Sequence, residues 1–296
     1  MNPTLGLLAA FGAFLSWGIG DFAIQRSARA VGSMAALFGI TAFGAIVLFP
    51  FAAPHLSAVF HSAYLLGLLL LTVLVTLFAA VFEFEALKKG KIAVIEPIMC
   101  LELVVTVGIS VVLLQEKVTT VQFLLMALIF SGILLTVIRH EPRHWWGWWR
   151  KKRRLERGVL LVLLGAFTMG ITNVVTGRSS QETDPVTAIW FIHTSLALIC
   201  LIWFIMNRNT HTVMREIRIH WRPVLAEGVF DNAAWLSYAA AVTYFPISIT
   251  NALTEGYIVL ASVLGIIFNK ERVQKHQAMG MVITIISAIV LAAISG

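Results

Sequence analysis

Hydrophobic and polar positions follow one another in long blocks along this chain, and the apolar blocks predict membrane-spanning helices. None of the blocks shows the strict apolar–polar alternation of a half-buried strand. A helix of about 20 residues spans a hydrocarbon core of about 30 Å, because each residue adds about 1.5 Å. Ten stretches reach that length: 4–25, 31–53, 62–87, 92–114, 118–138, 158–178, 185–206, 222–243, 247–268 and 274–294. The sequence therefore predicts an all-α integral membrane protein with ten transmembrane helices.

Basic residues between these stretches predict the orientation of the chain. Twenty of the 22 Lys and Arg residues fall in odd-numbered connections, whereas the even-numbered ones hold only Lys117 and Arg178. Basic loops stay in the cytoplasm. We therefore expect the odd-numbered loops of a multi-pass protein of the cell (cytoplasmic or inner) membrane to be cytoplasmic, with both termini outside.

Composition supports the membrane class. The 296 residues are 59% hydrophobic and 12% charged, and the mean hydropathy is +0.87. A soluble chain of this length cannot bury so much apolar surface. The formal net charge of +7 is spread over membrane loops, which argues against a nucleic-acid partner. Cys100 and Cys200 both fall inside apolar stretches, where packing is the expected role.

The two halves of the chain resemble each other. Two patterns recur, one at a shift of 155 residues and one at a shift of 152. The first pairs Glu116-Lys117-Val118, Gln122 and Met126 with Glu271-Arg272-Val273, Gln277 and Met281. The second pairs Gly18, Ile19, Arg26 and Ser27 with Gly170, Ile171, Arg178 and Ser179, and places Asp21 opposite Asn173. Five spans per half make the second half enter the membrane upside down, so we expect two inverted five-helix repeats, as in many secondary transporters.

This duplication divides the chain into residues 1–138, a linker at 139–157, and residues 158–296. The linker contains Trp145-Trp146-Gly147-Trp148-Trp149 followed by a basic run that ends at Arg154. Tryptophans favour the headgroup level, and each basic residue near the surface attracts anionic lipid by about 1 kcal/mol. A cytoplasmic topology anchor explains this linker; binding of anionic lipid headgroups at 145–154 is the alternative.

Ten spans, a duplicated five-span unit and a Glu-basic-x-x-x-x-Gln element at the last span of each unit resemble the EamA domain of the drug/metabolite transporter (DMT) superfamily. The segment from Glu85 to Gly132 carries the best match, and the resemblance covers nearly the whole chain. It implies two EamA-like repeats, drug or metabolite transport, and efflux as the direction. Many members are drawn with cytosolic termini, so the basic-residue tally implies the opposite orientation here.

Acidic residues inside the spans are the main candidates for function. Each costs at least about 2.5 kcal/mol at the bilayer centre on insertion scales, so a pathway or binding site is the first interpretation. No basic residue lies at comparable depth, and the carboxylates cannot all ionise cheaply without cations. An interior of this kind suits a cationic or zwitterionic substrate, or protons as coupling ions. The seven residues are Asp21, Glu83, Glu96, Glu102, Glu227, Asp231 and Glu255.

The eighth span gives the sharpest pattern. Glu227, Asp231, Trp235 and Tyr238 are spaced by four, four and three residues, which places them on one helix face. A carboxylate with aromatic neighbours holds an ammonium group through ion pairing and a cation–π attraction of about 2 kcal/mol when desolvated. For Glu227, an interfacial pair with Arg222 is the alternative, and the two aromatic side chains can equally serve packing.

The other spans supply further candidates, each with a structural alternative. Trp17 and Asp21 repeat the aromatic–carboxylate spacing in the first span, although Asp21 can pair with Arg26. Substrate-binding residues are expected at Glu102, Asn251, Glu255 and Tyr257 as well. A second tier, for coupling, comprises Glu83, Glu96, His193 and Glu227.

The second tier has its own alternatives. Glu96 can pair with Lys89 or Lys91, and the adjacent Pro97 either breaks the helix or simply begins it. His193 is the one histidine deep in a span, where a neutral ring bonded to a neighbouring helix competes with a proton relay. Glu116 and Glu271 are expected to cap the helices that follow them.

Enzymatic constellations are missing from the sequence. There is no nucleophile–base pair, no phosphate-binding loop, and no Cys or His cluster with metal spacing. We expect no enzyme activity, cofactor or metal. The predicted function is a secondary active transporter of a small amine, amino acid or related metabolite, with the leading carboxylates at Asp231, Glu255 and Glu102. It works by alternating access as a monomer or homodimer, with proton coupling as a hypothesis. A non-transporting receptor, scaffold or lipid-handling subunit is the alternative.

Overall fold

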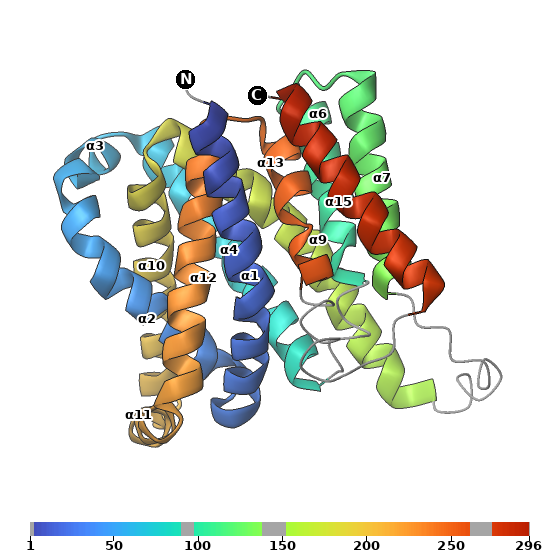
Figure 1. The fold of residues 1–296 in the computed structure, drawn as a ribbon. Helices are drawn as coiled ribbons and strands as arrows, with labels where there is room; N and C mark the ends of the chain where they lie inside the picture. Colours follow the sequence, from blue (N-terminus) through green and yellow to red (C-terminus); the bar gives the residue numbers. More distant parts are fainter. Residues whose placement is uncertain (1–2, 90–97, 138–151, 261–273, 296) are drawn as a thin grey trace.

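The computed structural model describes residues 3–89, 98–137, 152–260 and 274–295, and every regular element in these ranges is a helix (Figure 1). Glu96, Pro97, Glu271 and residues 139–151 of the linker lie outside the described residues, whereas residues 152–157 of the linker begin α9. The helices are α1 (Pro3–Val31), α2 (Ser33–Ala52), η1 (Ala53–His55), α3 (Leu56–Phe60), α4 (Ala63–Lys89), α6 (Leu101–Val112), α7 (Thr120–Val137), α9 (Lys152–Glu182), α10 (Pro185–Met206), α11 (Thr210–Ile219), α12 (Trp221–Ala241), α13 (Ile247–Thr254) and α15 (Lys275–Ser295).

The outer surface of this bundle is apolar, as a lipid-facing surface must be. Large side chains such as Ile46, Val112 and Ile289 are exposed on it, at 75%, 71% and 63%. Six helices in the described ranges are long and apolar enough to cross a membrane, while α6 and α7 are shorter apolar helices. The prediction of an all-helical, multi-pass membrane protein is confirmed, and the number of ten crossings stays a prediction.

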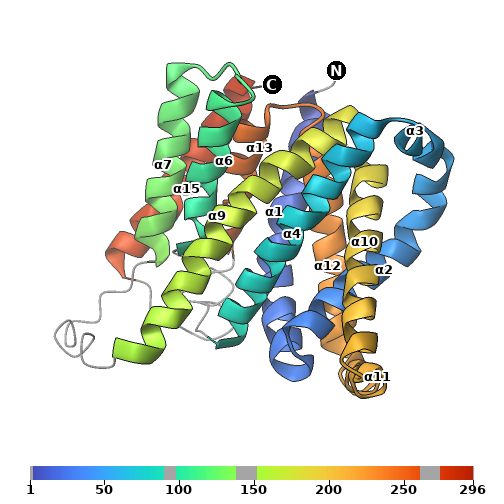
Figure 2. The ribbon, with the colours of Figure 1, turned by 180° about the vertical axis from the view of Figure 1, so that it is seen from behind.

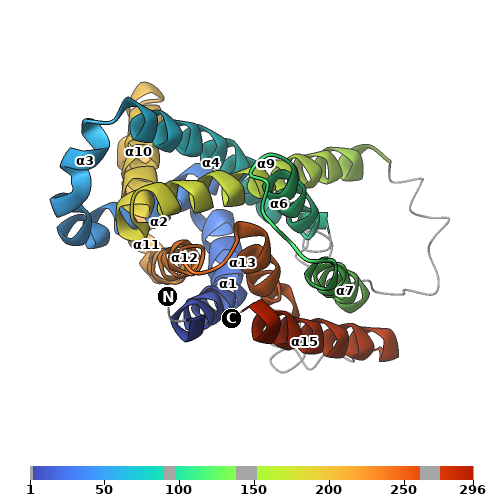
Figure 3. The same ribbon diagram turned by 90° about the horizontal axis from the view of Figure 1, so that it is seen from above.

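Helices from the two halves of the chain pack against each other in a reciprocal pattern. α1 packs on α12 and α4 packs on α9, while α2 packs on α10, α7 on α15 and α6 on α13 (Figures 2 and 3). If α1, α2, α4, α6 and α7 are replaced in order by α9, α10, α12, α13 and α15, and the reverse, the same five pairs result. The sequence duplication therefore corresponds to a duplication in the packing.

The pair formed by α7 and α15 shows what the glutamine of the repeated element does. The side-chain oxygen of Gln122 accepts a hydrogen bond from the Thr119 backbone N–H, and the Gln122 backbone N–H donates to the Thr119 hydroxyl. The two residues therefore form a reciprocal cap at the start of α7. The Gln122 side-chain amide also donates to Ser295 Oγ at the end of α15 (3.1 Å). Gln277, at the start of α15, donates to the carbonyl of Thr136 near the end of α7 (3.0 Å). The two helices therefore run antiparallel.

The two ends of the bundle differ in charge. The start of α1 and the end of α15 lie at one end, together with α3, while α11 lies at the other (Figure 1). Arg26 and Arg29 near the end of α1, and Arg215 and Arg218 on α11, lie toward the α11 end. Lys117 and Arg178 fall at the end that holds the termini. For these six described residues, the division along the sequence is thus also a division in space.

Two predicted spans are interrupted where the sequence suggested continuous helices. α6 begins at Leu101 after a turn at Cys100, and α13 ends at Thr254 before a turn at Glu255 and Gly256. At both turns a backbone hydrogen bond joins residues three apart, as in a 3₁₀ helix, instead of four apart. Leu103 N–H donates to the Cys100 carbonyl (3.2 Å), and Ile258 N–H donates to the Glu255 carbonyl (3.3 Å). Cys100 and Glu255 are separated by the 155-residue shift, so the interruptions occupy equivalent positions in the two halves.

Candidate functional site

A cavity of about 70 Å³ lies between the two halves of the chain. This volume exceeds the roughly 10–15 Å³ that one water molecule requires. The first, third, fourth, sixth, eighth and ninth predicted spans contribute to its wall. α2 and α10 contribute too, through Thr41 and His193, and of these two only Thr41 was not selected from the sequence. No lining residue comes from α7 or α15 among the described residues.

Most residues selected from the sequence meet in this cavity. The ten that line it are Trp17, Asp21, Glu83, Glu102, His193, Asp231, Trp235, Asn251, Glu255 and Tyr257. They are drawn from positions as far apart as α1 and the segment after α13. Their convergence is a property of the tertiary fold, which brings equivalent helices of the two halves together.

Two selected residues lie outside the cavity wall, and a third lies outside the described residues. Tyr238 is fully buried, and its hydroxyl donates to the Asn173 carbonyl (3.0 Å), which ties α12 to α9. Glu227 is also fully buried, and it accepts a hydrogen bond from Ser27 Oγ (2.7 Å) rather than pairing with Arg222. These two side chains thus bond to α9 and α1 and are not among the residues that line the cavity. Glu96 is the third residue.

Carboxylates dominate the polar part of the cavity. Asp21, Glu102, Asp231 and Glu255 are 3–8% exposed, and Glu83 lies within electrostatic reach of Asp21, Glu102 and Asp231. Glu102 and Glu255, from equivalent interrupted segments of the two halves, are within hydrogen-bonding reach of each other. Among the described lining residues there is no Lys or Arg. The described wall thus offers a concentration of carboxyl oxygens without a Lys or Arg side chain.

Aromatic rings form the other part of the wall. Trp17 stacks edge-on against Trp235, with ring centroids 5.2 Å apart and an interplanar angle of 89°. The rings of Tyr257 and Tyr238 also contact Trp17, with ring centroids 6.1 Å and 5.7 Å from that of the indole. Three helical segments therefore meet at one indole. Because Trp17 and Trp235 each lie four residues from an aspartate on the same helix, ring faces and carboxylates share one space.

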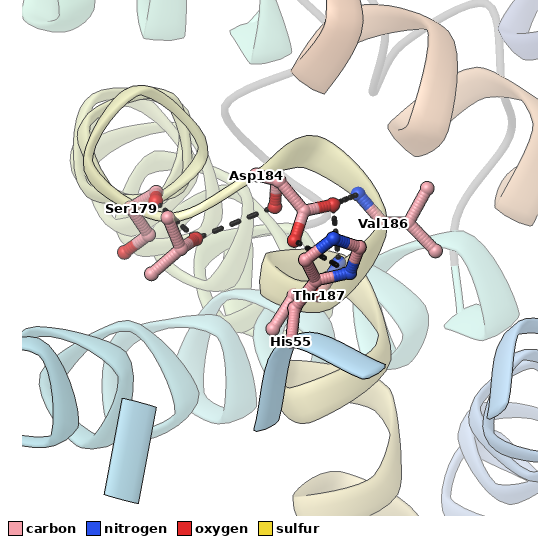
Figure 4. Close-up of polar contacts among 6 residues, drawn as sticks. His55, Ser179, Asp184, Val186 and Thr187 are labelled. Carbon is pink, nitrogen blue, oxygen red and sulfur yellow. Dashed lines mark hydrogen bonds and ion pairs between the residues drawn. The ribbon is translucent and has the colours of Figure 1, made fainter. Parts of the chain in front are cut away.

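Two caps fix the helices that carry these groups. Asp184 Oδ1 accepts the backbone N–H groups of Val186 (3.0 Å) and Thr187 (3.1 Å), and so begins α10, the helix of His193. Figure 4 shows this cap, with His55 reaching from η1 to within 4.0 Å of Asp184 Oδ2. Pro185, which cannot donate a backbone hydrogen bond, suits the first position of the helix.

The second cap crosses between the halves. α13 starts after Pro246, whose side chain has no acceptor, and Glu116 supplies one from the first half. Its carboxylate accepts Ile247 N–H (2.6 Å), Ser248 N–H (3.0 Å) and the Ser248 hydroxyl (2.6 Å). We expected Glu116 to cap the helix that follows it. Thr119 and Gln122 cap that helix, α7, instead. Glu116 is therefore a helix cap, as expected, but it caps α13 and not α7.

The cavity also contains residues that the sequence did not single out. Thr41 and Thr76 contribute hydroxyls, and the Thr76 hydroxyl has no hydrogen-bond partner in the described part of the chain. Asn173 lines the cavity as well. The repeat alignment already placed Asn173 opposite Asp21, which was a usable signal. The threonines gave none, because such residues are common in apolar helices. No group of three His, Cys, Asp or Glu residues suited to a metal ion occurs within the described ranges.

Comparison with known proteins gives a family and a fold. The model of the EamA-like transporter family matches residues 4–138 and 156–293. No curated protein matches the chain. One of 29 matching solved chains is a crystal structure of a protein that superimposes with a TM-score of 0.72 and 15% sequence identity, covering 98% of this chain and 98% of its own. At that identity the likeness shows the fold alone.

Proposed function

Because the chain belongs to the EamA-like transporter family, which the resemblance of its sequence had indicated, we propose that it is a secondary active transporter of a small amine, amino acid or related metabolite. One observation carries this proposal. Five carboxylates and four aromatic rings from both halves line a single cavity whose described wall holds no Lys or Arg. Export is the direction that the family resemblance implies.

The chemistry of the wall supports a cationic or zwitterionic substrate. Charged groups inside a bilayer are costly, so a cluster of carboxylates needs compensation from cations or protons. An ammonium group supplies compensating charge and several N–H donors at once. The faces of Trp17 and Trp235 add a cation–π attraction, worth about 2 kcal/mol when the site is desolvated. Asp231, Glu255 and Glu102 are the leading substrate carboxylates in this proposal, with Asp21 beside them.

Transport requires the cavity to open to alternate sides, and the duplication suggests how. We propose ten transmembrane helices in two inverted five-helix repeats, 1–138 and 158–296, that rock against each other. The antiparallel contact of α7 with α15 supports the inversion. The interruptions at Cys100 and Glu255 place irregular backbone beside the cavity, where transporters commonly bind substrates and ions. The carboxyl pair of Glu102 and Glu255 spans the interface between the repeats and is a natural place for a coupling proton.

Orientation and partners belong to the proposal as well. The basic end of the bundle, marked by α11, is assigned to the cytoplasm, which leaves both termini outside. The linker at 145–154 is assigned to anionic lipid headgroups, and each chain holds both repeats, so a monomer or homodimer suffices. Labelling of single cysteines introduced at Thr4 and at Thr210 with an impermeant maleimide in intact cells tests the orientation. We expect the cysteine at position 4 to be labelled and the cysteine at position 210 to be protected. The opposite result would reverse the assigned orientation.

A thermal-shift screen of the detergent-purified protein tests the substrate class. A ligand that binds only the folded state raises the melting temperature by mass action. The ligands are amino acids, polyamines, quaternary amines, and neutral and acidic metabolites, at pH 6 and pH 8. We expect cationic or zwitterionic compounds to stabilise the protein. Stabilisation by neutral or anionic compounds alone rejects the substrate class.

Matched variants locate the binding site. Asp231→Asn and Glu255→Gln should abolish the shift, whereas Glu216→Gln should leave it, because Glu216 lies on α11 and pairs with Arg215 at the surface. Proton coupling is tested separately in proteoliposomes. Transport rates that do not respond to an imposed pH gradient exclude it.

A further inference from the structure

His193 and Asn232 form a buried side-chain pair beside the cavity. His193 comes from α10 and Asn232 from α12, and both are less than a tenth exposed. The imidazole Nδ1 lies 2.8 Å from the Asn232 side-chain oxygen. His193 also lines the cavity, whereas Asn232 lies behind it. The pair therefore joins a cavity side chain to the packed interior between α2, α10 and α12.

The surroundings of Asn232 determine which way its amide points. Its nitrogen donates to two backbone carbonyls, that of Ile40 on α2 (3.0 Å) and that of Gly228 on its own helix (2.8 Å). Reversing the amide would place its oxygen against both carbonyl oxygens and its NH₂ group against the ring. A buried arrangement with acceptor facing acceptor leaves polar groups unsatisfied, which costs about 1–3 kcal/mol for each group. The amide oxygen is therefore the atom that faces His193.

An acceptor opposite Nδ1 requires that Nδ1 carry a hydrogen. A neutral imidazole has one donor nitrogen and one acceptor nitrogen. Nε2 then holds the lone pair, and in the described part of the chain no residue bonds to it. We propose that Asn232 holds His193 in the Nδ1–H tautomer, so that Nε2 faces the cavity as a hydrogen-bond acceptor and binds the N–H group of an ammonium substrate. Asn232 is a positioning residue in this arrangement.

Close packing by α2 keeps the pair in place. A Cβ atom at Gly44 would collide with the Asn232 amide oxygen and with His193 Nδ1. Only a glycine lets this turn of α2 lie directly over the bond. The pair therefore has no free space on the side that faces α2, and a larger residue at Gly44 would displace it.

The tautomer decides which end of a zwitterion contacts α10, and this consequence rests on the proposed function. An Nε2–H group would donate to a substrate carboxylate, whereas an Nε2 lone pair accepts from an ammonium group. With the lone pair in the cavity, His193 extends the row of acceptors that Asp21, Asp231 and Glu255 provide. The substrate carboxylate must then be bound elsewhere, and an amine without a carboxylate fits equally well.

Nitrogen NMR of the whole protein in lipid bilayers tests the tautomer without any transport assay. The protein is labelled with ¹⁵N-histidine, and the His193 signals are identified by their loss in His193→Gln. We expect a protonated Nδ1 and an unprotonated Nε2 at pH 8. In Asn232→Leu this preference should be lost. A hydrogen on Nε2 in the unmodified protein overturns the proposal, whether or not the protein transports amines.

Two small cations test the binding role of Nε2. Ethylammonium carries N–H donors and tetramethylammonium carries none. We expect saturable movement of the His193 Nε2 signal with ethylammonium alone. An unmoved signal, or equal movement with both cations, overturns the binding role. His193→Asn keeps a donor for Asn232 but removes the group at the Nε2 position, so it should fold normally and lose the rise in melting temperature that ethylammonium gives the unmodified protein.

Discussion

Removal of the Glu116 side chain should destabilise the protein, although this residue lies outside the cavity. Glu116 accepts three hydrogen bonds from the first two residues of α13, two of them from backbone N–H groups that have no other cap. Loss of a helix cap costs about 0.5–2 kcal/mol, and bonds to a charged acceptor are worth about 1.5–3 kcal/mol each when buried. The site is part-buried, so water replaces some of this, and we expect Glu116→Ala to cost about 2–3 kcal/mol in total.

This cost is measurable as a change in melting temperature. About 2–4 °C is lost per kcal/mol in a large domain, so the melting temperature in detergent should fall by about 5–10 °C. Glu182→Ala is the matched control, because Glu182 forms only a partly exposed ion pair with Arg178, worth about 0–1 kcal/mol. Ser248→Ala removes one of the three donors and should cost about 1 kcal/mol. In the double variant the two costs should not add, because the residues share a bond. Equal melting temperatures for Glu116→Ala and Glu182→Ala would refute the cap.

Three further predictions concern packing and the site. Gly132→Ala should lower the melting temperature, because the added Cβ would lie 2.8 Å from the Gly280 carbonyl oxygen and 2.9 Å from Thr284 N. Gly108→Ala is the control, since there is open space around Gly108, and an equal effect of the two variants would contradict the close contact of α7 with α15. Tyr238→Phe should cost about 1–2 kcal/mol, because the Asn173 carbonyl loses its buried donor, yet ligand affinity in the thermal-shift screen should stay unchanged; a loss of affinity would place Tyr238 in the site after all. Ser27→Ala should destabilise by about 1–3 kcal/mol, because buried Glu227 loses the hydroxyl that donates to Oε1, and chemical unfolding that shows no change would indicate that Glu227 has another partner.

The sequence predicted the helices well where apolar length alone decides them. The stretch at 185–206 coincides with α10, and that at 62–87 lies within two residues of the bounds of α4. It failed at the interruption beside Glu255, since the stretch 247–268 is apolar enough on average to predict one continuous span. Hydropathy measures transfer to lipid and does not register a local change from four-residue to three-residue hydrogen bonding.

The site was predictable to the extent that burial in lipid makes a carboxylate unusual. Asp21, Glu83, Glu102, Asp231 and Glu255 were selected on that ground, and the fold brings them into one cavity. Glu227 met the same criterion but lies elsewhere, because its partner Ser27 is 200 residues away in the chain. Helix periodicity placed Tyr238 on the face of Asp231, yet it could not show that α9 covers that end of the face. Asn232 gave no signal at all, since its role depends on two helices meeting at Gly44.

Transport in proteoliposomes tests the central claim most directly. Purified protein is reconstituted, and uptake of radiolabelled amino acids and polyamines is measured beside Asp231→Asn and the surface control Glu216→Gln. We predict saturable uptake of at least one cationic or zwitterionic compound, lost in Asp231→Asn and retained in Glu216→Gln. Uptake no greater than in protein-free liposomes for every compound, or equal uptake by Asp231→Asn, would contradict a carboxylate-lined transport site.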